Sequence, residues 1–195
     1  MLFRSVKGTD RGVMLADLIE EHRRPGAPHP LDAIGEHPAN RAFPSGAYVC
    51  EVEIDRETGA PHVVAFTAVD DVGHALNMTM VEGQVVGGAV QSIGHVFGEQ
   101  LCYDAGSGQM LTGSLMDYPV PRADQLGEFR LTDCPVASPN NLLGAKGAGE
   151  TGTTGGLPAC MNAVLDAVRP VGVKHLDMPM TPSRLWTAVN GSQAR

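Results

Sequence analysis

Apolar and polar residues alternate in two neighbouring stretches near the middle of the chain. In "AYVCEVEID" (47–55) one face carries the apolar side chains, which are Tyr48, Cys50, Val52 and Ile54, and the other face carries acidic residues. "HVVAFTAVDD" (62–71) follows after the turn signal "RETGAP". Alternation with a period of two is typical of a half-buried β-strand, and a short turn between two such strands indicates a hairpin. The pattern therefore predicts an antiparallel hairpin over 47–71.

Apolar residues recur at helical spacing in three other stretches. One is a short run in 12–23, and the longer ones contain Val86, Val90, Ile93 and Phe97 in 82–104, and Leu157, Met161, Val164, Leu165 and Val168 in 157–169. A repeat near 3.6 residues indicates a helix with one apolar face. A last helix is expected after Thr181, because Thr is a favoured N-cap and Pro182 would occupy the first helical position.

The remaining segments predict irregular structure or short strands. Residues 23–46 hold five of the 14 prolines and indicate an irregular connection, which we expect to lie over a surface rather than to separate two domains. Short strands are expected in 108–121 and in "VKHLDMP" (173–179). Together the patterns predict an α+β fold over 1–195, with a mixed or antiparallel sheet and two to three packed helices. A doubly wound sheet is not expected.

Composition and charge exclude several classes of protein. The net charge of −8, with no basic stripe interleaved with aromatic residues, argues against nucleic-acid binding. No apolar run reaches the roughly 20 residues that a bilayer span needs, and the first residues lack the apolar core of a signal peptide. Four cysteines lie far apart without a C-x-x-C pair, which argues against a zinc or iron–sulfur site on this chain and fits a reducing cytoplasm: Cys50, Cys102, Cys134 and Cys160.

A glycine-rich stretch, "GAKGAGETG" (144–152), contains a single glutamate and a single lysine. Its residues 147–152 match G-x-G-x-x-G, but turn residues that include Pro139 precede the match where a dinucleotide-binding fold needs a buried strand. Lys146 is not followed by the Ser or Thr of a phosphate-binding loop. Neither nucleotide-binding motif is therefore favoured.

Two polar side chains in glycine-rich surroundings are candidates for chemistry. Glu150 is either an acidic residue that gains stability near a helix start, or a general base whose pKa is raised in a desolvated pocket. Gln84, between Gly83 and the Gly87–Gly88 pair, is either a surface amide or a ligand contact where bare backbone allows close approach. Spacing alone leaves both alternatives open, and no His pair suggests a protein-held metal.

Four stretches, taken in order, resemble one known family. They are "SGAYVCEVEIDRETG" (45–59), "AVDDVGHALNMTMVEGQVVGGAVQSIGHVFGE" (68–99), "GSLMDYPVPRADQL" (113–126) and "SPNNLLGAKGAGETGTTGGLPACMNAVLDAV" (138–168). The chain resembles the C-terminal end of the molybdenum-binding large subunit of the xanthine dehydrogenase, aldehyde oxidase and carbon monoxide dehydrogenase family. The family usually has proline where Met78 stands, and "NPLG" where this chain reads "NLLG".

The resemblance implies roles for the glycine-rich segments. Glu150 matches the family's active-site glutamate, a general base beside molybdenum, and Gln84, next to Gly83, matches a glutamine that contacts the pterin. The residues that match the loop carrying the glutamate are Lys146, Gly147, Ala148 and Gly149. The implied cofactor is molybdopterin with molybdenum, in many bacterial members as the cytosine dinucleotide. The implied reaction hydroxylates an aldehyde, N-heterocycle or related substrate, with water as the oxygen donor.

The resemblance also implies partners. The family's large subunit is several times longer than this chain, and its upstream part holds most cofactor and substrate contacts; 2Fe-2S and FAD groups lie on other modules or subunits. We therefore expect 1–195 to be a single C-terminal cofactor-binding domain that works with that upstream part. The chain is then a fragment, a separately encoded piece of a split subunit, or a non-catalytic relic or structural subunit. An exposed apolar interface, and a homodimer formed through it, are further expectations.

Overall fold

The computed structural model describes residues 3–5, 7–29, 31–36, 38 and 40–191. The chain divides into two compact units, Met1–Ala39 and Asn40–Arg195. The division falls inside the proline-rich connection, which has no helix or strand among its described residues before Ser45. The prediction that 23–46 does not separate compact parts thus differs from this division, because few tertiary contacts cross an extended proline-rich segment. The assignment of 1–195 to one domain stays a prediction.

The first unit is small. Its strands β1 (Phe3–Ser5) and β2 (Gly12–Met14) pair antiparallel, and helix α1 (Leu15–Glu21) follows directly. The predicted helix over 12–23 is therefore shorter than expected, because its first residues pair with β1 instead. The His29 ring forms a hydrogen bond with the carbonyl of Ile19 at 2.8 Å, which joins the segment after α1 to that helix.

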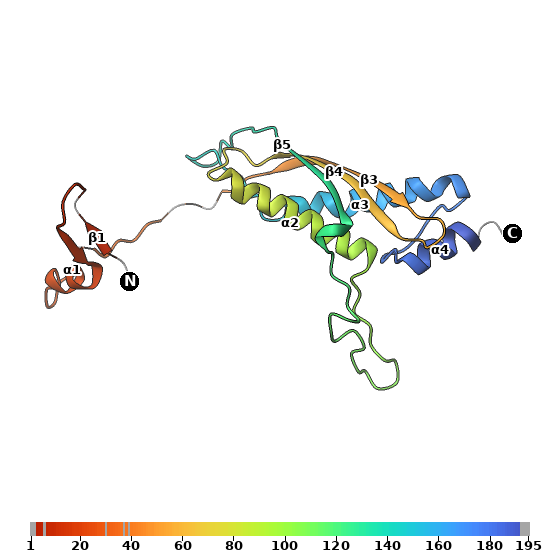
Figure 1. Cartoon of the computed structure of the whole chain (residues 1–195). Helices are drawn as coiled ribbons and strands as arrows, with labels where there is room; N and C mark the ends of the chain where they lie inside the picture. Colours follow the sequence, from red (N-terminus) through yellow and green to blue (C-terminus); the bar gives the residue numbers. More distant parts are fainter. Residues whose placement is uncertain (1–2, 6, 30, 37, 39, 192–195) are drawn as a thin grey trace. The chain divides into compact units, whose positions relative to one another are not determined.

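The second unit contains a three-stranded mixed sheet in the order β3–β4–β5 (Figure 1). Strands β3 (Ser45–Ile54) and β4 (Pro61–Asp71) form the predicted antiparallel hairpin. Strand β5 (Leu126–Asp133) pairs parallel to β4, and sequence reasoning missed it. Burial alternates along β3 as the polar pattern predicted. The α+β fold class with a mixed sheet is confirmed.

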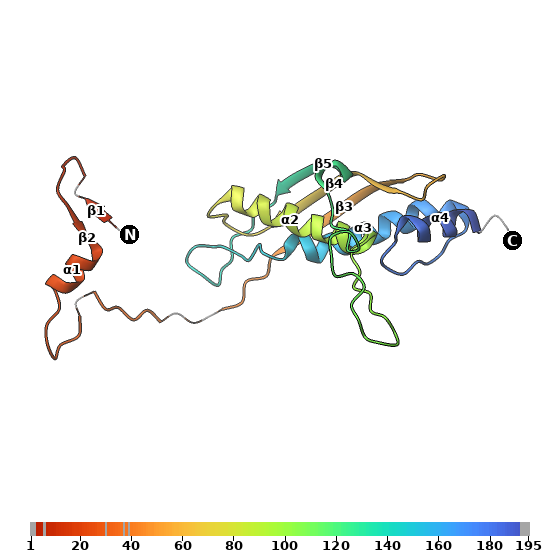
Figure 2. The same ribbon diagram turned by 60° about the horizontal axis from the view of Figure 1, so that its bottom comes forward.

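Helices α2 (Met78–Phe97) and α3 (Thr151–Val168) lie side by side beneath the sheet (Figures 1 and 2). Helix α4 (Pro182–Gly191) lies near the turn that joins β3 to β4. Single 3-10 turns occur at Ala123–Gln125 and Arg169–Val171. Buried side chains from the sheet, these helices and the segment before α4 form one core: Cys50, Val63, Phe66, Ala68, Val85, Ala89, Ile93, Val96, Cys160, Val164, Val168, Met180, Leu185 and Val189. The predicted start of α4 is confirmed, with the Thr181 hydroxyl accepting from the Arg184 N–H at 3.4 Å.

The buried face of α2 differs from the predicted one. Val86, Val90 and Phe97 are only half-buried, and the buried positions are Val85, Gly88, Ala89, Ser92, Ile93, Gly94 and Val96. The physical reason is the close crossing of α2 and α3. A Cβ built on Gly152 would lie 2.1 Å from the Val85 carbonyl oxygen, and one on Gly88 would lie 2.6 Å from the Thr153 nitrogen. Small residues are buried because backbone meets backbone there.

The segment between α2 and β5 does not form the predicted structure. Helix α2 ends at Phe97 rather than at 104, and residues 98–122 form an irregular excursion from the body of the unit (Figure 1). The strand predicted over 108–121 is absent from these described residues, apart from an isolated bridge between Tyr103 and Met110. The strand predicted in 173–179 is also absent there. Alternating apolar residues form no strand where no neighbouring strand supplies hydrogen bonds.

Two glycine-to-alanine changes test the close helix crossing. Gly152→Ala should lower the free energy of unfolding by about 1–3 kcal/mol, because the new methyl overlaps the Val85 carbonyl. Gly87→Ala in α2 should raise it by roughly 0.5–1 kcal/mol, because nothing lies within 4 Å of its Cβ position and alanine favours helix. Urea unfolding of both variants measures the difference. A stabilising Gly152→Ala would contradict the crossing.

Candidate active site

Two acidic residues at the end of β4 are buried, with only 6% of Asp70 and 9% of Asp71 exposed. The Asp71 carboxylate accepts hydrogen bonds from the N–H groups of Gly73 and Val136, each at 2.9 Å, and pairs with the Lys146 ammonium. The Lys146 N–H donates to the Val72 carbonyl at 2.8 Å. These contacts fasten the start of the glycine loop to the end of the sheet.

The same contacts set the charge state of Asp71. The Lys146 ammonium, followed by the N–H groups of Val136 and Gly73, lowers the pKa of Asp71 from its usual 3.8 to about 2. Hydrogen bonds and a nearby cation both stabilise the ionised carboxylate. Lys146 was predicted within the cofactor loop, and the structure gives its side chain an anchoring contact with Asp71.

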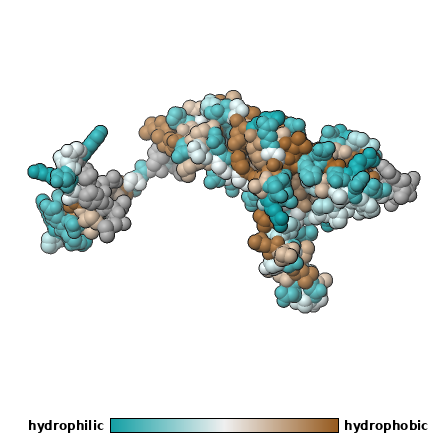
Figure 3. All heavy atoms as spheres, viewed as in Figure 1, coloured by the Kyte–Doolittle hydropathy of each residue, from teal (hydrophilic) through white to brown (hydrophobic). Residues whose placement is uncertain are grey.

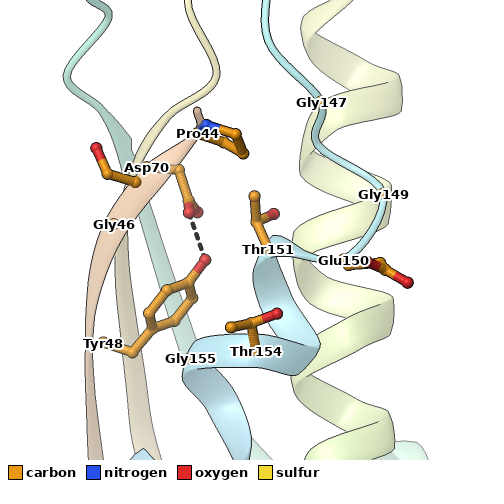
Figure 4. A pocket seen from close by; sticks show the side chains of 11 residues that line it. Pro44, Gly46, Tyr48, Asp70, Gly147, Gly149, Glu150, Thr151, Thr154 and Gly155 are labelled. Carbon is orange, nitrogen blue, oxygen red and sulfur yellow. Dashed lines mark hydrogen bonds between the residues drawn. The ribbon is translucent and has the colours of Figure 1, made fainter. Parts of the chain in front are cut away.

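The glutamate of the loop lies at the start of α3. Glu150 occupies the N-cap position, its carbonyl accepts from the Thr154 N–H at 2.9 Å, and its exposed side chain makes no capping bond. In Figure 4 its carboxylate points away from Tyr48 and Asp70. A desolvated carboxylate was one of the two alternatives that the sequence left open for Glu150, and a position near a helix start was the other. The described residues of this chain do not enclose it, so desolvation would require atoms from outside the chain.

The helix crossing brings the two predicted polar residues to neighbouring positions. Gln84 directly precedes Val85, whose carbonyl lies against Gly152, and Glu150 lies two residues before that same glycine. The Gln84 side chain is exposed, as is Gly83 beside it. Gln84 and Glu150 are far apart in the sequence, but both lie next to this helix crossing. Gln84 is on the exposed side of α2, and Glu150 is at the start of α3.

A cavity of about 360 Å³ lies between the first turns of α3 and the strands β3 and β4 (Figure 4). Of the predicted residues, Gly147, Gly149 and Glu150 line it, whereas Gly83, Gln84, Lys146 and Ala148 do not. Sequence reasoning missed the rest of the lining, which comprises Pro44, Ser45, Gly46, Tyr48, Asp70, Thr151, Thr154 and Gly155. The alternation in β3 placed Tyr48 on the inward face, but no local signal placed Asp70 beside it.

The Tyr48 phenol donates a hydrogen bond to Asp70 inside this cavity. Burial raises the pKa of Asp70 above its usual value, although the bond from Tyr48 opposes the rise. Burial, together with the hydrogen bond and negative charge of Asp70, raises the pKa of Tyr48 well above 10. The cavity thus holds a buried carboxylate whose phenol partner stays protonated.

In the part of the chain that the structure describes, no group of three or more His, Cys, Asp or Glu side chains has the arrangement of a metal site. Within the same residues, no helix combines the length and apolar character of a membrane span.

Comparison with known sequences identifies relatives. Residues 6–127 match the family described as "Molybdopterin cofactor-binding domain", which is more than half of the chain. The carbon monoxide dehydrogenase large chain of Hydrogenophaga pseudoflava is 38% identical over 189 residues, covering 94% of this chain and 23% of that protein. The nicotine 6-hydroxylase large subunit of Paenarthrobacter nicotinovorans is 38% identical over 149 residues, covering 76% of this chain and 18% of that protein.

Solved structures show the same fold. Carbon monoxide dehydrogenase from Oligotropha carboxidovorans superposes with a TM-score of 0.75 at 35% identity, over 80% of this chain and 19% of that one. Quinoline 2-oxidoreductase from Pseudomonas putida 86 superposes with a TM-score of 0.68 at 37% identity, over 71% of this chain and 17% of that one. The chain therefore spans about a fifth of the length of these relatives.

The Asp71 anchor predicts a pH-dependent stability. A carboxyl group whose pKa is lower in the folded than in the unfolded chain adds stability above its unfolded pKa, and that contribution disappears as the pH falls. For Asp71 the loss should begin near pH 4 and proceed toward pH 2. Asp71→Asn should therefore destabilise the chain most at neutral pH. The difference in the free energy of unfolding between the variant and the unchanged chain should become smaller as the pH falls from about 4 toward 2.

Urea unfolding of both chains between pH 7 and pH 3 measures this gap. Asp166→Asn is the matched control, because the Asp166 side chain is 75% exposed in its pair with Arg169 and such pairs contribute little. A gap for Asp71→Asn that is equally large at pH 7 and pH 3 would contradict the anchor.

Proposed function

The chain belongs to the molybdopterin cofactor-binding domain family, and from that premise we propose that it is the C-terminal molybdenum-cofactor portion of a molybdenum hydroxylase. Its substrate would be an aldehyde, an N-heterocycle or a related compound, with water as the oxygen donor. The observation that carries the proposal is the placement of Glu150 and Gln84 at one helix crossing, beside a loop of bare glycine backbone. Named relatives that act on carbon monoxide, nicotine and quinoline support the class of chemistry.

The residues at the crossing fit a flat, anionic cofactor. Around Gly83 and Gly87 on α2, and around Gly147 and Gly149 in the loop, nothing lies within 4 Å of the positions that a Cβ would occupy. Bare backbone of this kind allows a rigid ring to approach closely. The exposed amide of Gln84 offers both a donor and an acceptor. The first N–H groups of α3 lack partners within the helix and favour negative charge.

In this proposal the bound cofactor supplies the redox chemistry, and the protein supplies position and proton transfer. Glu150 would act as the general base, because it ends the glycine loop with a carboxylate that forms no ion pair among the described residues. A positioned base of this kind contributes about 10²–10⁴ in rate. Gln84 would hold the pterin by hydrogen bonds, and Lys146 would fasten the loop through Asp71. Gly147, Ala148 and Gly149 would then lie against the cofactor.

We propose that a longer partner completes the site. The chain spans about a fifth of its relatives, so most cofactor and substrate contacts would come from the upstream part of a large subunit. A cytosine dinucleotide form of the cofactor, and 2Fe-2S and FAD groups on further subunits, belong to the same proposal. Exposed apolar side chains near the loop support a covered surface: Leu76, Met80, Leu142 and Leu143, each at least 60% exposed. The four free cysteines support a cytoplasmic location.

The proposal predicts that molybdenum purifies with the chain. The tagged chain isolated from its native cell should contain molybdenum in stoichiometric amount, together with a larger partner. Glu150→Gln should lower turnover by about 10²–10⁴, because the base is lost, and should leave the metal bound. Element analysis and an assay with aldehydes and N-heterocycles measure both quantities.

Glu53→Gln serves as the control, since this exposed residue lies on β3 away from the loop. A chain purified with neither metal nor partner would contradict the enzyme proposal and would favour a non-catalytic relic or structural subunit. A homodimer that lacks molybdenum would favour the same alternative.

A further inference from the structure

Three side chains outside the predicted site lie between the sheet and the start of α3. Tyr48 belongs to β3 and its phenol donates to Asp70 on β4. Thr151 lines the same cavity as these two residues, from the side of α3. Thr151 is the first residue of α3, and its hydroxyl donates to the Ala148 carbonyl at 3.0 Å. One hydrogen bond therefore fixes Tyr48 at the end of the sheet, and a separate one joins the first turn of α3 to the glycine loop; the two lie on opposite sides of one cavity (Figure 4).

The aromatic ring of Tyr48 contacts α3 directly. A Cβ built on Gly155 would lie 2.0 Å from Cδ2 of Tyr48, so the ring lies directly against bare helix backbone. At the other end, a Cβ on Gly46 would lie 2.7 Å from the Asp70 carboxylate. Two glycines thus leave room for the pair, and a larger residue at either position would displace it. The arrangement requires these small residues on two separate elements.

Glu150 has few contacts of its own that would hold it. Its side chain is exposed and makes no capping bond, and the flanking Gly147 and Gly149 face open space. The loop is held at one end by Lys146 through Asp71. At the other end Glu150 is covalently joined to Thr151, on the opposite side of the same turn (Figure 4). The position of the carboxylate therefore depends on how firmly Thr151 is held.

We propose that Tyr48, Asp70 and Thr151 are positioning residues that hold the first turn of α3 and thereby aim Glu150. We call this set the Tyr48 tether. Hydrogen bonds to a charged group are stronger than neutral ones, and Asp70 is 6% exposed with Tyr48 as its hydrogen-bond donor among the described residues. The tether itself is independent of the proposed function. Its catalytic consequence rests on that function, because a displaced base loses rate without losing affinity for substrate.

Amide hydrogen exchange on the full chain tests the tether without any cofactor. Tyr48→Phe and Thr151→Val should each raise the exchange rates of amides in 148–154 by about tenfold, because the first loses the bond that holds the ring of Tyr48 in place through Asp70 and the second loses the bond to the Ala148 carbonyl. Thr151→Ser retains the hydroxyl and should keep the rates of the unchanged chain. Tyr118→Phe is the matched control, because it removes another phenol–carboxylate bond, to Glu99 at 2.7 Å, on a different part of the second unit.

Three exchange results would contradict the tether. One is an unchanged rate in 148–154 for Tyr48→Phe. Another is a rise in the amide exchange rates of β4 and α2 that is as large as the rise in 148–154. Such a result would show that the variant loses global stability and that the effect is not local to the first turn of α3. Equal effects of Thr151→Val and Thr151→Ser would likewise contradict a role for the hydroxyl.

The catalytic consequence is tested in the molybdenum-containing complex. Tyr48→Phe should lower kcat by about 10- to 100-fold while KM and molybdenum content stay unchanged, and Thr151→Ser should keep kcat. An unchanged kcat in Tyr48→Phe, or a raised KM alone, would overturn this consequence. If the unmutated complex contains no molybdenum and shows no turnover, the proposed function fails, and the exchange result still decides whether the tether exists.

Discussion

The contact of backbone with backbone where α2 crosses α3 determines the rest of the second unit. Gly88 and Gly152 permit this approach, because a Cβ on either residue would overlap main-chain atoms of the other helix. The crossing places the turn that carries Gln84 beside the turn that begins at Glu150. It also explains why both helices have glycine at these positions, although each glycine costs about 1 kcal/mol against alanine in a helix interior. The two helices lose some intrinsic stability, and the segments that carry Gln84 and Glu150 pack closely together.

The glycine loop is fixed at both ends and open between them. Lys146 joins one end to the buried Asp71, and the Tyr48–Asp70 pair lies against the first turns of α3 at the other. Asp71 therefore holds one end of the loop through Lys146, and its neighbour Asp70 bonds the tyrosine that packs against α3 at the other end. Glu150 remains exposed, and so do many apolar side chains of the same unit (Figure 3). A loop held at its ends and exposed apolar side chains in the same unit support our proposal that a longer partner completes the domain.

Sequence reasoning predicted what local pattern determines and missed what distant partners determine. Alternation in β3 and β4 predicted the hairpin, and Thr181 with Pro182 predicted α4. The start of α2 at Met78 could have been found, because the Asn77 side chain caps it by accepting from the Met80 N–H. No local pattern could pair β5 with β4, or bury Asp71 beside Lys146. The resemblance identified Glu150 and Gln84, whereas Tyr48 and Asp70 become neighbours only through strand pairing and the cavity they share.

The most direct test of this account is a crystal structure of the chain with its partner and its molybdenum cofactor bound. The account predicts that the pterin lies against the open backbone of Gly147 and Gly149 and beside Gln84. The carboxylate of Glu150 should face the metal while Tyr48 keeps its bond to Asp70. A cofactor bound on another face of the domain, or a Glu150 carboxylate turned away from the metal, would contradict it.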